Sequence, residues 1–548
     1  MTPPPRPAAS PSDPASRAGS PGAASPARPG SPVADGSSEP VRAAPVSLGE
    51  VAGVVARRVD ELRQAGLLRE DLFVDGRWMP ASQESRLAVH DPATGELIGS
   101  VATATGDDVR EAVAAAERAL GSWRSQPAGE RAAVLWRWQE LMSVHGEELA
   151  TLLTVEQGKP LGEARGEIAY SAAFLRYYAE EARRGYGEVI PGNRPGRRLF
   201  ALRQPIGVVA AITPWNFPAL MIARKVAPAL AAGCTVVLKP PSEAPLSALA
   251  LAELSSRAGM PPGVLDVVHG EPVTVGAVLA GSPTVRMLTF TGSTEVGKLL
   301  MAQCAPTVKR VALELGGNAP FVVFDDADLD AAVAGAIESK YRNAGQTCVC
   351  SNRLLVQAGI HDAFVERLVR ATADLVVGHG IDPAVHVGPL IDDRAVAKVE
   401  RHLADAEGQG AAVLKGGRRH ELGGTFFEPT VLVGAVPGMA VASEETFGPV
   451  APVFRFETED EALALANSTE SGLAAYFYTR DLGRAFRFGE GLEFGVVGVN
   501  TGSISYEGAP FGGMKQSGLG REGSHHGLEE FLEVKYLCID GVMAGSAR

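Results

Sequence analysis

A cysteine in a turn-prone segment is the residue of this 548-residue chain best suited to covalent chemistry. Cys348 follows the run Asn343-Ala-Gly-Gln-Thr, and Cys350 stands two residues later. Glu314 lies earlier in the chain, in the run Glu-Leu-Gly-Gly. A thiolate can attack a carbonyl carbon, and a carboxylate can act as a base. The two side chains are therefore the minimum set for covalent catalysis on a carbonyl compound.

The residues around Cys348 favour a reactive thiol. Buried cysteines are more often small hydrophobic side chains than nucleophiles, but Gly345-Gln-Thr before Cys348 is typical of a loop. If a helix begins at the cysteine, its dipole favours the thiolate. Asn216, in Pro-Trp-Asn-Phe-Pro, could donate its amide to an oxyanion together with the Cys348 N–H. The alternative role for Asn216 is an Asx turn beside proline.

Three further segments have the composition of nucleotide-binding loops. Lys239-Pro-Pro-Ser242 offers a cation and a hydroxyl between an expected strand and an expected helix. Phe290-Thr-Gly-Ser-Thr-Glu-Val-Gly297 offers free N–H groups for a pyrophosphate but lacks Gly-x-Gly-x-x-Gly. In Glu444-Glu-Thr-Phe-Gly-Pro449, Glu445 could accept ribose hydroxyls and Phe447 could pack on a nicotinamide ring. Taken singly, each segment is better explained as an ordinary loop, so only the combination argues for a dinucleotide.

The composition excludes several classes of protein. A net charge of −13 argues against a nucleic-acid surface, because phosphate binding requires a basic stripe. No apolar run reaches the roughly 18–20 residues of a membrane span. Five cysteines suit a reducing cytoplasm rather than a disulfide framework. The histidines show no metal-ligand spacing, so no metal is expected, and His525-His526 is expected on a surface helix.

The first 60 residues or so differ from the rest of the chain. They consist mainly of Pro, Ala, Ser and Gly, with few large apolar side chains to offset the entropy of ordering. We therefore expect a disordered tail up to about Val59. The segment lacks the apolar region of a secretory signal, and its prolines oppose the amphipathic helix of a transit peptide.

From Asp71 onward the pattern is that of an α/β protein. A strand–turn–strand with Asp75-Gly76 as the turn is expected first. Strands at 206–212, 234–238, 264–268 and 286–290 alternate with helices, which predicts a parallel, doubly wound sheet that binds ligands at its carboxyl ends. The pattern restarts after Gly317, with strands at 321–324 and 353–356. We expect a Rossmann-like cofactor domain (61–184 and 205–316) and an α/β catalytic domain (317–509).

Together these segments resemble the aldehyde dehydrogenase superfamily, from about Asp71 to the C-terminus. Each motif alone is modest, and their order along the chain makes the resemblance specific. The nearest branch is the succinate-semialdehyde dehydrogenases, through Glu156-Gln-Gly-Lys-Pro160, Arg342-Asn-Ala-Gly-Gln-Thr-Cys-Val-Cys350 and Lys515-Gln-Ser-Gly-Leu-Gly-Arg-Glu-Gly523. The seven general motifs are Pro214-Trp-Asn-Phe-Pro218, Lys239-Pro-Pro-Ser242, Phe290-Thr-Gly-Ser-Thr294, Glu314-Leu-Gly-Gly317, Gly345-Gln-Thr-Cys348, Glu444-Glu-Thr-Phe-Gly-Pro449 and Pro510-Phe-Gly-Gly513.

The resemblance implies a route for the reaction. Cys348 attacks the aldehyde to give a thiohemiacetal, while Asn216 and the Cys348 N–H hold the oxyanion. Loss of hydride to the nicotinamide leaves a thioester, and Glu314 activates the water that hydrolyses it. The chemistry agrees with this route, because a tetrahedral oxyanion loses hydride more easily than a planar aldehyde does.

The resemblance also implies NADP or NAD as cofactor. Relatives with glutamate at the position of Ser242 tend to use NAD, because a carboxylate repels a 2′-phosphate. Serine beside Lys239 removes that repulsion and leaves a cation, so we expect NADP to be preferred. The residues expected to bind the dinucleotide are Trp215, Lys239, Pro240, Pro241, Ser242, Gly292, Ser293, Thr294, Glu295, Val296, Gly297, Glu445 and Phe447.

The substrate implied by the resemblance is a small semialdehyde, namely succinate semialdehyde. Arg224, Arg342 and Ser505 are the residues expected to grip its distal carboxylate, which suits an arginine fork. Tyr506 and Gly508 depart from the expected residues beside Ser505 and leave the chain length of the substrate open. Glutarate semialdehyde, one carbon longer, is the alternative substrate.

Two other classes of function are weaker. A non-catalytic structural protein on this scaffold would not need Cys348, Glu314 and Asn216 together. Release of the thioester to coenzyme A rather than to water is disfavoured by Glu314, the expected water-activating base.

Cys350 is, by resemblance to enzymes with the same Cys-x-Cys, a candidate redox switch for Cys348. Residues two apart in an extended segment point the same way but lie near the upper distance limit for a disulfide. The bond would need a bent loop, and its strain would make it readily reduced. An inert packing thiol is an equal alternative.

The resemblance places a small β oligomerisation element at 185–204 and 525–540. An exposed sheet edge there would pair with a second subunit. A homodimer or homotetramer is therefore expected.

Overall fold

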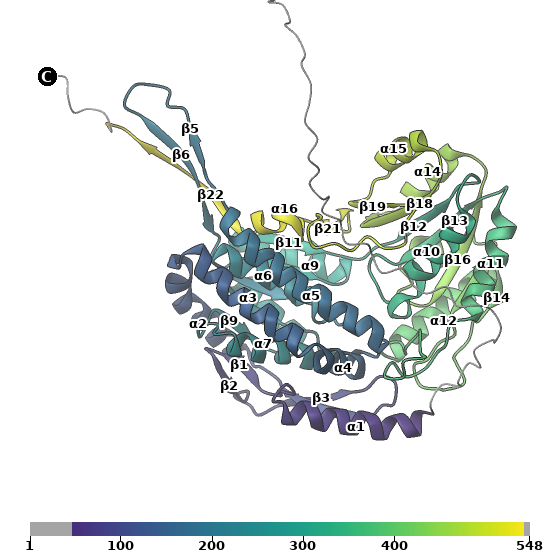
Figure 1. Ribbon diagram of the computed structural model, residues 1–548, viewed down its shortest axis with the longest axis horizontal. Helices are drawn as coiled ribbons and strands as arrows, with labels where there is room; N and C mark the ends of the chain where they lie inside the picture. Colours follow the sequence, from purple (N-terminus) through teal and green to yellow (C-terminus); the bar gives the residue numbers. More distant parts are fainter. Residues whose placement is uncertain (1–46, 542–548) are drawn as a thin grey trace, which may run out of the picture. The chain divides into compact units, whose positions relative to one another are not determined.

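The computed structural model describes residues 47–541, which contain two large sheets with helices packed against them (Figure 1). The first sheet has eight strands in the order β2-β1-β9-β8-β7-β10-β11-β21. Its strands are β1 (Leu72–Val74), β2 (Arg77–Met79), β7 (Val208–Ile212), β8 (Thr235–Lys239), β9 (Leu265–Val267), β10 (Val285–Thr291), β11 (Arg310–Glu314) and β21 (Gly518–Leu519). The predicted hairpin, with Asp75 and Gly76 at its turn, and the four predicted strands of this sheet are confirmed.

The five central strands of this sheet are parallel, and the order in which the chain adds strands switches from one side of β7 to the other. Strands β8 and β9 lie on one side of β7, and β10 and β11 lie on the other. Ile212 is paired with both Lys239 and Phe290, and Thr291 is paired with Glu314. This register brings the carboxyl ends of β7, β8, β10 and β11 level, so the loops that follow them share one edge.

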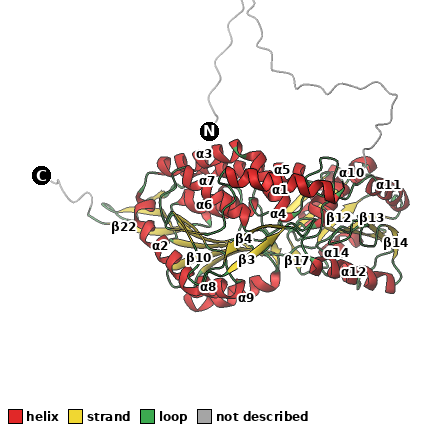
Figure 2. Cartoon of the chain, turned by 90° about the horizontal axis from the view of Figure 1, so that it is seen from below, coloured by secondary structure: helices red, strands yellow, loops and turns green. Residues whose placement is uncertain are grey.

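Helices cover both faces of the first sheet (Figure 2). The helices fall into two groups, and the apolar residues of each group form a separate hydrophobic core with the sheet. The first group is α1 (Leu48–Gln64), α3 (Ala128–Val144), α4 (Gly146–Gln157), α5 (Leu161–Glu181), α6 (Leu220–Ala232) and α7 (Leu246–Arg257). The second is α2 (Gly106–Ser125), α8 (Pro272–Gly281) and α9 (Thr294–Cys304). A separate hairpin joins β3 (Arg86–His90) to β4 (Leu97–Ala102).

The second sheet has seven strands in the order β14-β15-β16-β13-β12-β18-β19, all parallel except β14. They are β12 (Ala319–Val323), β13 (Ser351–Gln357), β14 (Ala412–Lys415), β15 (Thr430–Val433), β16 (Val450–Phe456), β18 (Ala474–Tyr478) and β19 (Val496–Val499). Its helices are α10 (Leu329–Tyr341), α11 (His361–Ala373), α12 (Asp393–Gly408), α13 (Ala440–Ser443), α14 (Glu459–Asn467) and α15 (Leu482–Gly491). Figure 2 shows α10 and α11 on one side of this sheet and α12 and α14 on the other. The two strands predicted after Gly317, at 321–324 and 353–356, correspond to β12 and β13.

The candidate residues lie at opposite edges of the two sheets. Glu314 ends β11, at the carboxyl edge of the first sheet, and five residues later Ala319 begins β12 in the second. Ala319 is paired with Ser351, the first residue of β13, which directly follows Cys350. The carboxyl edge of the first sheet therefore faces the amino edge of the second across the Glu-Leu-Gly-Gly turn.

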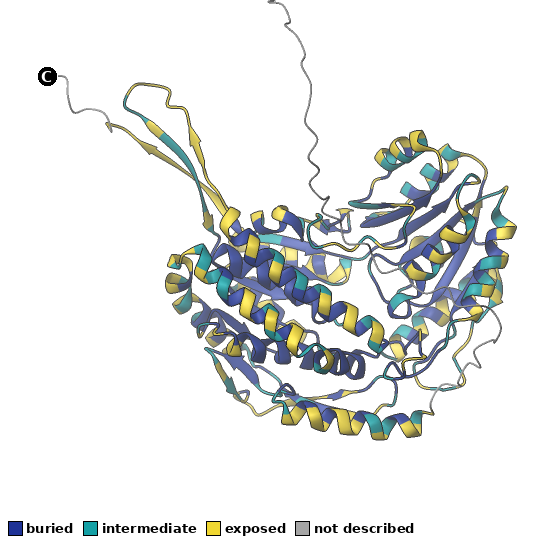
Figure 3. Cartoon of the chain, in the orientation of Figure 1, coloured by how far each residue is buried: buried dark blue, intermediate teal, exposed yellow. Residues whose placement is uncertain are grey.

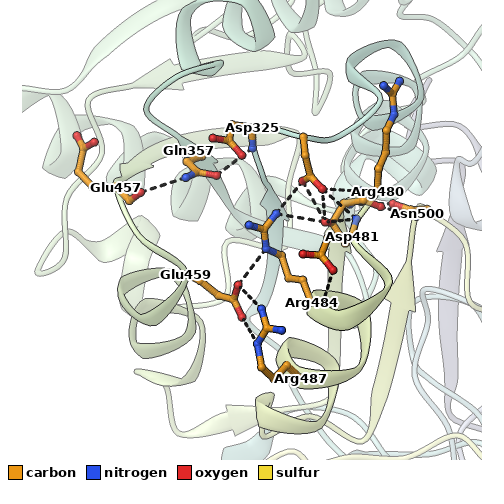
Figure 4. Close-up of polar contacts among 11 residues, drawn as sticks. Asp325, Gln357, Glu457, Glu459, Arg480, Asp481, Arg484, Arg487 and Asn500 are labelled. Carbon is orange, nitrogen blue, oxygen red and sulfur yellow. Dashed lines mark hydrogen bonds and ion pairs between the residues drawn. The ribbon is translucent and has the colours of Figure 1, made fainter.

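The carboxyl edge of the second sheet is occupied by a charged network instead (Figure 4). The Asp326 carboxylate accepts hydrogen bonds from the Thr479 hydroxyl and from Arg484, whose Nε lies 3.0 Å from Glu459. Asn500 exchanges two 2.9 Å hydrogen bonds with the backbone of Thr479. This network anchors the start of the segment that carries Ser505.

A third sheet extends from the first as an arm (Figure 1). Its order is β22-β6-β5, built from β5 (Glu188–Ile190), β6 (Arg198–Pro205) and β22 (Leu532–Ile539). Most of its residues are exposed (Figure 3), including the large apolar side chains Val189, Val534 and Tyr536. The short helix α16 (Ser524–Glu529) precedes β22 and carries His525 and His526 on the surface, as predicted.

The expected disordered tail is wrong for its last part, because residues 48–64 form helix α1. Ser47 and Glu50 make a capping box at its start, which satisfies two otherwise free N–H groups. Helical spacing places Val51, Val55, Val59 and Leu62 on one buried face, in the same core as α3–α7. The unit around the first sheet therefore begins near residue 48 and not at 61. Residues 1–46 lie outside the described part of the chain.

Candidate active site

Two cavities meet at Cys348. The larger, the front cavity, has a volume of about 520 Å³ and lies between the carboxyl edge of the first sheet and α12. The smaller, the rear cavity, has a volume of about 290 Å³ and lies between α5, α6 and the segment before β13. Cys348 contributes to the lining of both. The thiol is thus accessible from two sides.

The front cavity gathers part of the predicted cofactor set: Trp215, Gly292, Ser293, Glu445 and Phe447. Lys239, Pro240, Pro241 and Ser242 lie outside its lining, as do the residues 294–297 that form the first turn of α9. Both groups nevertheless lie at or after the carboxyl ends of β8 and β10, the two strands that pair with β7.

Aromatic rings from the two sheets form a wall of the front cavity. The Trp215 and Phe447 rings meet edge to face, with centroids 5.6 Å apart. Phe447 has φ of 55°, a left-handed conformation that is strained for a bulky residue. The preceding Thr446 is fixed by a 3.1 Å hydrogen bond from its N–H to the Asn352 side chain. Strain held in this way is typical of a site that must present a ring in one orientation.

Polar groups in and beside the front cavity fit a dinucleotide. Ser293 caps α9, its hydroxyl accepting from the Val296 N–H, and the helix start offers further N–H groups to a phosphate. Glu445 accepts from the Gly317 N–H at 3.1 Å, and desolvation raises the pKa of its carboxyl to about 7. Lys239 is buried, and desolvation lowers its pKa to about 8.

The rear cavity brings together all three residues predicted to grip a carboxylate. Arg224, Arg342 and Ser505 line it together with Cys348. The rest of its wall is mixed. Tyr170, Phe217, Leu220, Met221, Val349 and Phe511 contribute apolar surface, and Glu163, Gly166, Glu167 and Thr347 complete the lining. Tyr506 is not part of the lining and is 63% exposed, with its ring packed over Gly508. Any effect of Tyr506 on the substrate is therefore exerted from outside the cavity.

Arg224 is held in place by a buried counter-ion. Its Nε lies 2.8 Å from Glu522, which also pairs with Lys225. The guanidinium stacks on Phe511 at 3.8 Å from the ring centre. Its Nη2 is buried and has no hydrogen-bond partner among the described residues. One end of the guanidinium is thus neutralised and fixed, and the other end is free to bind an anion.

Asn216 follows β7 and lies against the loop of the nucleophile. Its side-chain N–H donates to the Gln346 carbonyl at 3.0 Å. A carboxamide has two N–H donors, so the second is available to the front cavity, which Asn216 also lines.

Cys348 does not begin a helix, contrary to the expectation. It lies in a turn between the short 3-10 segment Arg342–Gly345 and β13. Desolvation raises the pKa of its thiol to about 12, and the carboxyls of Glu445 and Glu314 add to this rise. The loop geometry is set instead by three consecutive left-handed residues, Asn343, Ala344 and Gly345, with φ of 52°, 55° and 76°.

Glu314 is buried at the end of β11, and neither carboxyl oxygen has a hydrogen-bond partner among the described residues. Desolvation raises its pKa well above the usual range, and the nearby Glu522 carboxylate raises it further. Gly512 packs so closely that a Cβ there would approach the Glu314 carboxyl to 2.9 Å. The carboxyl is therefore dry and without a counter-ion, as suits a base whose pKa is tuned upward.

Cys350 is a buried free thiol whose Sγ donates to the Lys340 carbonyl at 3.3 Å. Cys348 is also a free thiol. The Lys340 contact turns the Cys350 sulfur toward α10.

Several residues of the site had no predicted role. Glu522 holds Arg224 from behind and is itself paired with Lys225. Asp392, Arg394 and Lys398 of the α12 region line the front cavity. Glu522 stands in the quoted Lys515–Gly523 motif, but only the fold reveals that it lies against α6. The residues of α12 carry no motif, so the sequence held no signal for them.

Two findings concern the rest of residues 47–541. In that part of the chain no helix is long and apolar enough to cross a membrane. His525, His526 and Glu529 form the one group there that could hold a metal, although none was expected from the spacing of the histidines. All three are exposed, and Glu529 already accepts a 2.9 Å hydrogen bond from Arg203.

We predict that alkylation of Cys348 is slow at neutral pH in the free protein. Because its thiol pKa is raised to about 12, the rate should keep rising with pH beyond ~8.5, where an ordinary thiol is half ionised. The measurement is peptide-resolved mass spectrometry of iodoacetamide labelling across pH, with the exposed Cys538 as internal reference. A plateau for Cys348 at the pH where Cys538 levels off would contradict the prediction.

Comparison with known proteins identifies the family. The model of the Aldehyde dehydrogenase family matches residues 78–537. The chain is 59% identical over 482 residues to a glutarate-semialdehyde dehydrogenase of Pseudomonas aeruginosa, covering 88% of this chain and 100% of that protein. It is 58% identical over 479 residues to an NADP+ succinate-semialdehyde dehydrogenase of Escherichia coli, covering 87% and 99%. The crystal structure of a succinate-semialdehyde dehydrogenase from Burkholderia pseudomallei superposes with a TM-score of 0.86 at 56% identity, covering 87% and 99%. The chain belongs to the aldehyde dehydrogenase family.

Proposed function

We propose that this enzyme oxidises succinate semialdehyde to succinate, with NADP or NAD as hydride acceptor. The observation that carries the proposal is the rear cavity, where the free Nη2 of Arg224 and the guanidinium of Arg342 share one space with the Cys348 thiol. A substrate held by its carboxylate on the arginines would present its aldehyde to the thiol. Relatives named as semialdehyde dehydrogenases support this substrate class.

The first chemical step is attack of the Cys348 thiolate on the aldehyde carbon. The thiol must first release its proton to solvent water, since its pKa is raised to about 12. The carbonyl oxygen gains the electron pair and becomes an oxyanion. The free N–H of the Asn216 amide and the Cys348 backbone N–H stabilise it.

Glu314 serves the second half of the reaction. A bound NADP or NAD supplies the acceptor for the hydride. The thioester on Cys348 is then attacked by water, whose proton passes to the Glu314 carboxylate, and the acid leaves as the thiol is restored. The absence of a counter-ion at Glu314 among the described residues keeps its basicity high.

We assign cofactor binding to the front cavity and the adjoining loops. Ser293 and the first turn of α9 face the phosphates, Glu445 takes the ribose, and Trp215 and Phe447 flank the nicotinamide. Lys239 and Ser242 favour a 2′-phosphate, so NADP is the preferred cofactor. The neighbouring Glu243 would oppose this, but Arg394 lies 3.6 Å from its carboxylate and offsets the charge.

Glutarate semialdehyde is the second candidate substrate, because a relative at 59% identity carries that name. One methylene typically changes specificity by only ~1–3 kcal/mol. The same arginine pair would hold either carboxylate.

We further infer the oligomeric state of the enzyme, its cellular location and the roles of its two α/β units. The arm of β5, β6 and β22 has exposed edges suited to pairing in a homodimer or homotetramer. The free cysteines suit a cytoplasmic enzyme. The unit around the first sheet binds the cofactor, and residues 317–509 carry the nucleophile.

We predict that Arg342→Leu lowers kcat/KM for succinate semialdehyde by about 10- to 100-fold, the value of a lost charge-assisted hydrogen bond. The value for an uncharged aldehyde such as butanal should change little, since only the carboxylate contact is removed. Steady-state kinetics with four- to six-carbon semialdehydes and uncharged aldehydes is the measurement. Arg176→Leu, an exposed change on α5, is the matched control. Equal losses on charged and uncharged aldehydes would refute the carboxylate grip.

We predict that Ser242→Glu lowers kcat/KM for NADP about tenfold or more, because a carboxylate there repels the 2′-phosphate. The value for NAD should be little affected. Ser242→Ala, which removes the hydroxyl without adding charge, is the control. A wild-type enzyme that strongly prefers NAD would overturn the NADP assignment.

We predict that mild peroxide inactivates the enzyme in a form that dithiothreitol reverses, and that Cys350→Ala abolishes this reversibility. A Cys348–Cys350 disulfide would protect the nucleophile from overoxidation. Residual activity before and after reduction is the readout, with Cys538→Ala as the control for an exposed thiol. Unchanged behaviour in Cys350→Ala would make Cys350 a packing residue.

A further inference from the structure

The turn between α4 and α5 lies against the loop that carries Asn216, although it lines neither cavity. Lys159 is buried there, and its Nζ donates to the backbone carbonyl of Asn216 at 2.7 Å. Its charge is balanced by Glu167, 2.6 Å away. The other oxygen of Glu167 accepts from the N–H groups of Ala219 and Leu220, at 3.0 and 3.1 Å. One ion pair therefore holds both the Asn216 carbonyl and the start of α6.

A second donor reaches the same carbonyl from the nucleophile loop. The Asn343 side chain donates to the Asn216 carbonyl at 3.0 Å and to the Gln346 carbonyl at 3.2 Å. Its own oxygen accepts from the Gln157 side chain at 3.0 Å. Its backbone N–H donates to Glu163 at 2.8 Å. Asn343 is buried. Its side-chain amide, its side-chain oxygen and its backbone N–H each make at least one hydrogen bond.

The Gln346 carbonyl connects the two loops in return, since it accepts from the Asn216 amide at 3.0 Å. Asn216 is thus fixed at both ends, by its carbonyl and by its amide. Gln346 stands two residues before Cys348. The distance between the amide and the nucleophile is set by these bonds and by the left-handed turn of residues 343–345.

We propose that Asn343 and Lys159 are positioning residues that clamp Asn216 against the Cys348 loop and so set the oxyanion-binding geometry. The inference rests on the proposed roles of Asn216 and Cys348. An oxyanion donor acts only at hydrogen-bond distance from the developing charge, and small displacements are costly to the rate. The Glu156–Pro160 motif thereby gains a function: it supplies Gln157 and Lys159 to the clamp.

Asn343→Gly tests the clamp without adding backbone strain. Glycine adopts the left-handed conformation of residue 343 freely, so the variant removes the side-chain donors and leaves the turn possible. Glu84→Gly is the matched control, because it makes the same change to glycine at an exposed left-handed residue that lines neither cavity. Single-turnover reduction of NADP with excess enzyme should slow about 10- to 100-fold in Asn343→Gly, short of the 10²–10³-fold cost of losing an oxyanion donor. It should stay within about twofold of the wild type in Glu84→Gly.

Two further readouts separate positioning from general damage. The dissociation constant for NADP and the rate of Cys348 alkylation should remain within about twofold of the wild type in Asn343→Gly, since neither needs the oxyanion site. Lys159→Met combined with Glu167→Gln, which removes the donor without leaving a bare charge, should slow the same step.

A double-mutant cycle decides whether Asn343 acts through Asn216. If it does, Asn343→Gly has little further effect on a protein that already carries Asn216→Ala. An equal loss in both backgrounds, or a wild-type rate in Asn343→Gly, would overturn the proposal. Failure of the proposed function would look different. The wild-type protein would then fail to reduce NADP with any semialdehyde, or Asn216→Ala alone would leave the rate of NADP reduction unchanged.

Discussion

Exclusion of water from the crevice between the two sheets governs the ionisation of the active site. Desolvation raises the pKa of Cys348 to about 12 and that of Glu314 well above its usual range. Glu522 is just as deeply buried, yet its pKa is lowered: desolvation pushes it upward, but Lys225 and Arg224 outweigh that effect. The same environment therefore holds one carboxylate that two cations contact directly, with a lowered pKa, and one carboxyl on which those cations act without outweighing desolvation, with a raised pKa.

That difference ties the substrate end of the site to its chemical end. Glu522 fixes Arg224 in the rear cavity, and its negative charge is also the second cause of the raised pKa of Glu314. Loss of Glu522 would release a buried arginine and lower the basicity of Glu314 together. The crevice depends on joining the carboxyl edge of one sheet to the amino edge of another, which the short stretch from Glu314 to Ala319 achieves.

The sequence predicted what is local and left out what depends on long-range contact. The motifs after β7, β8, β10 and β11 could be placed because strand ends of a parallel sheet meet at one edge. Helix α1 was not predicted because the Pro-, Ala-, Ser- and Gly-rich composition of the preceding residues indicated disorder. That composition outweighed the capping box and the helical spacing of Val51, Val55 and Val59. The turn at Cys348 could not be foreseen, since Asn343 and Ala344 adopt left-handed conformations only where partners hold them. Glu522 gave no local sign of lying beside Arg224.

Burial of Lys159 with Glu167 makes sense on the same grounds. Taking an ion pair out of water costs several kcal/mol per ion, and apolar residues in its place are often as stable. The pair is therefore a poor means of stabilising α5 against α6. It is, however, a good means of fixing carbonyl and N–H groups, because Lys159 bonds to the backbone carbonyl of Asn216 and Glu167 to the backbone N–H groups of Ala219 and Leu220. Its energetic cost is reasonable only if the position of that loop matters more than the stability of the fold, as it does where an amide must meet an oxyanion.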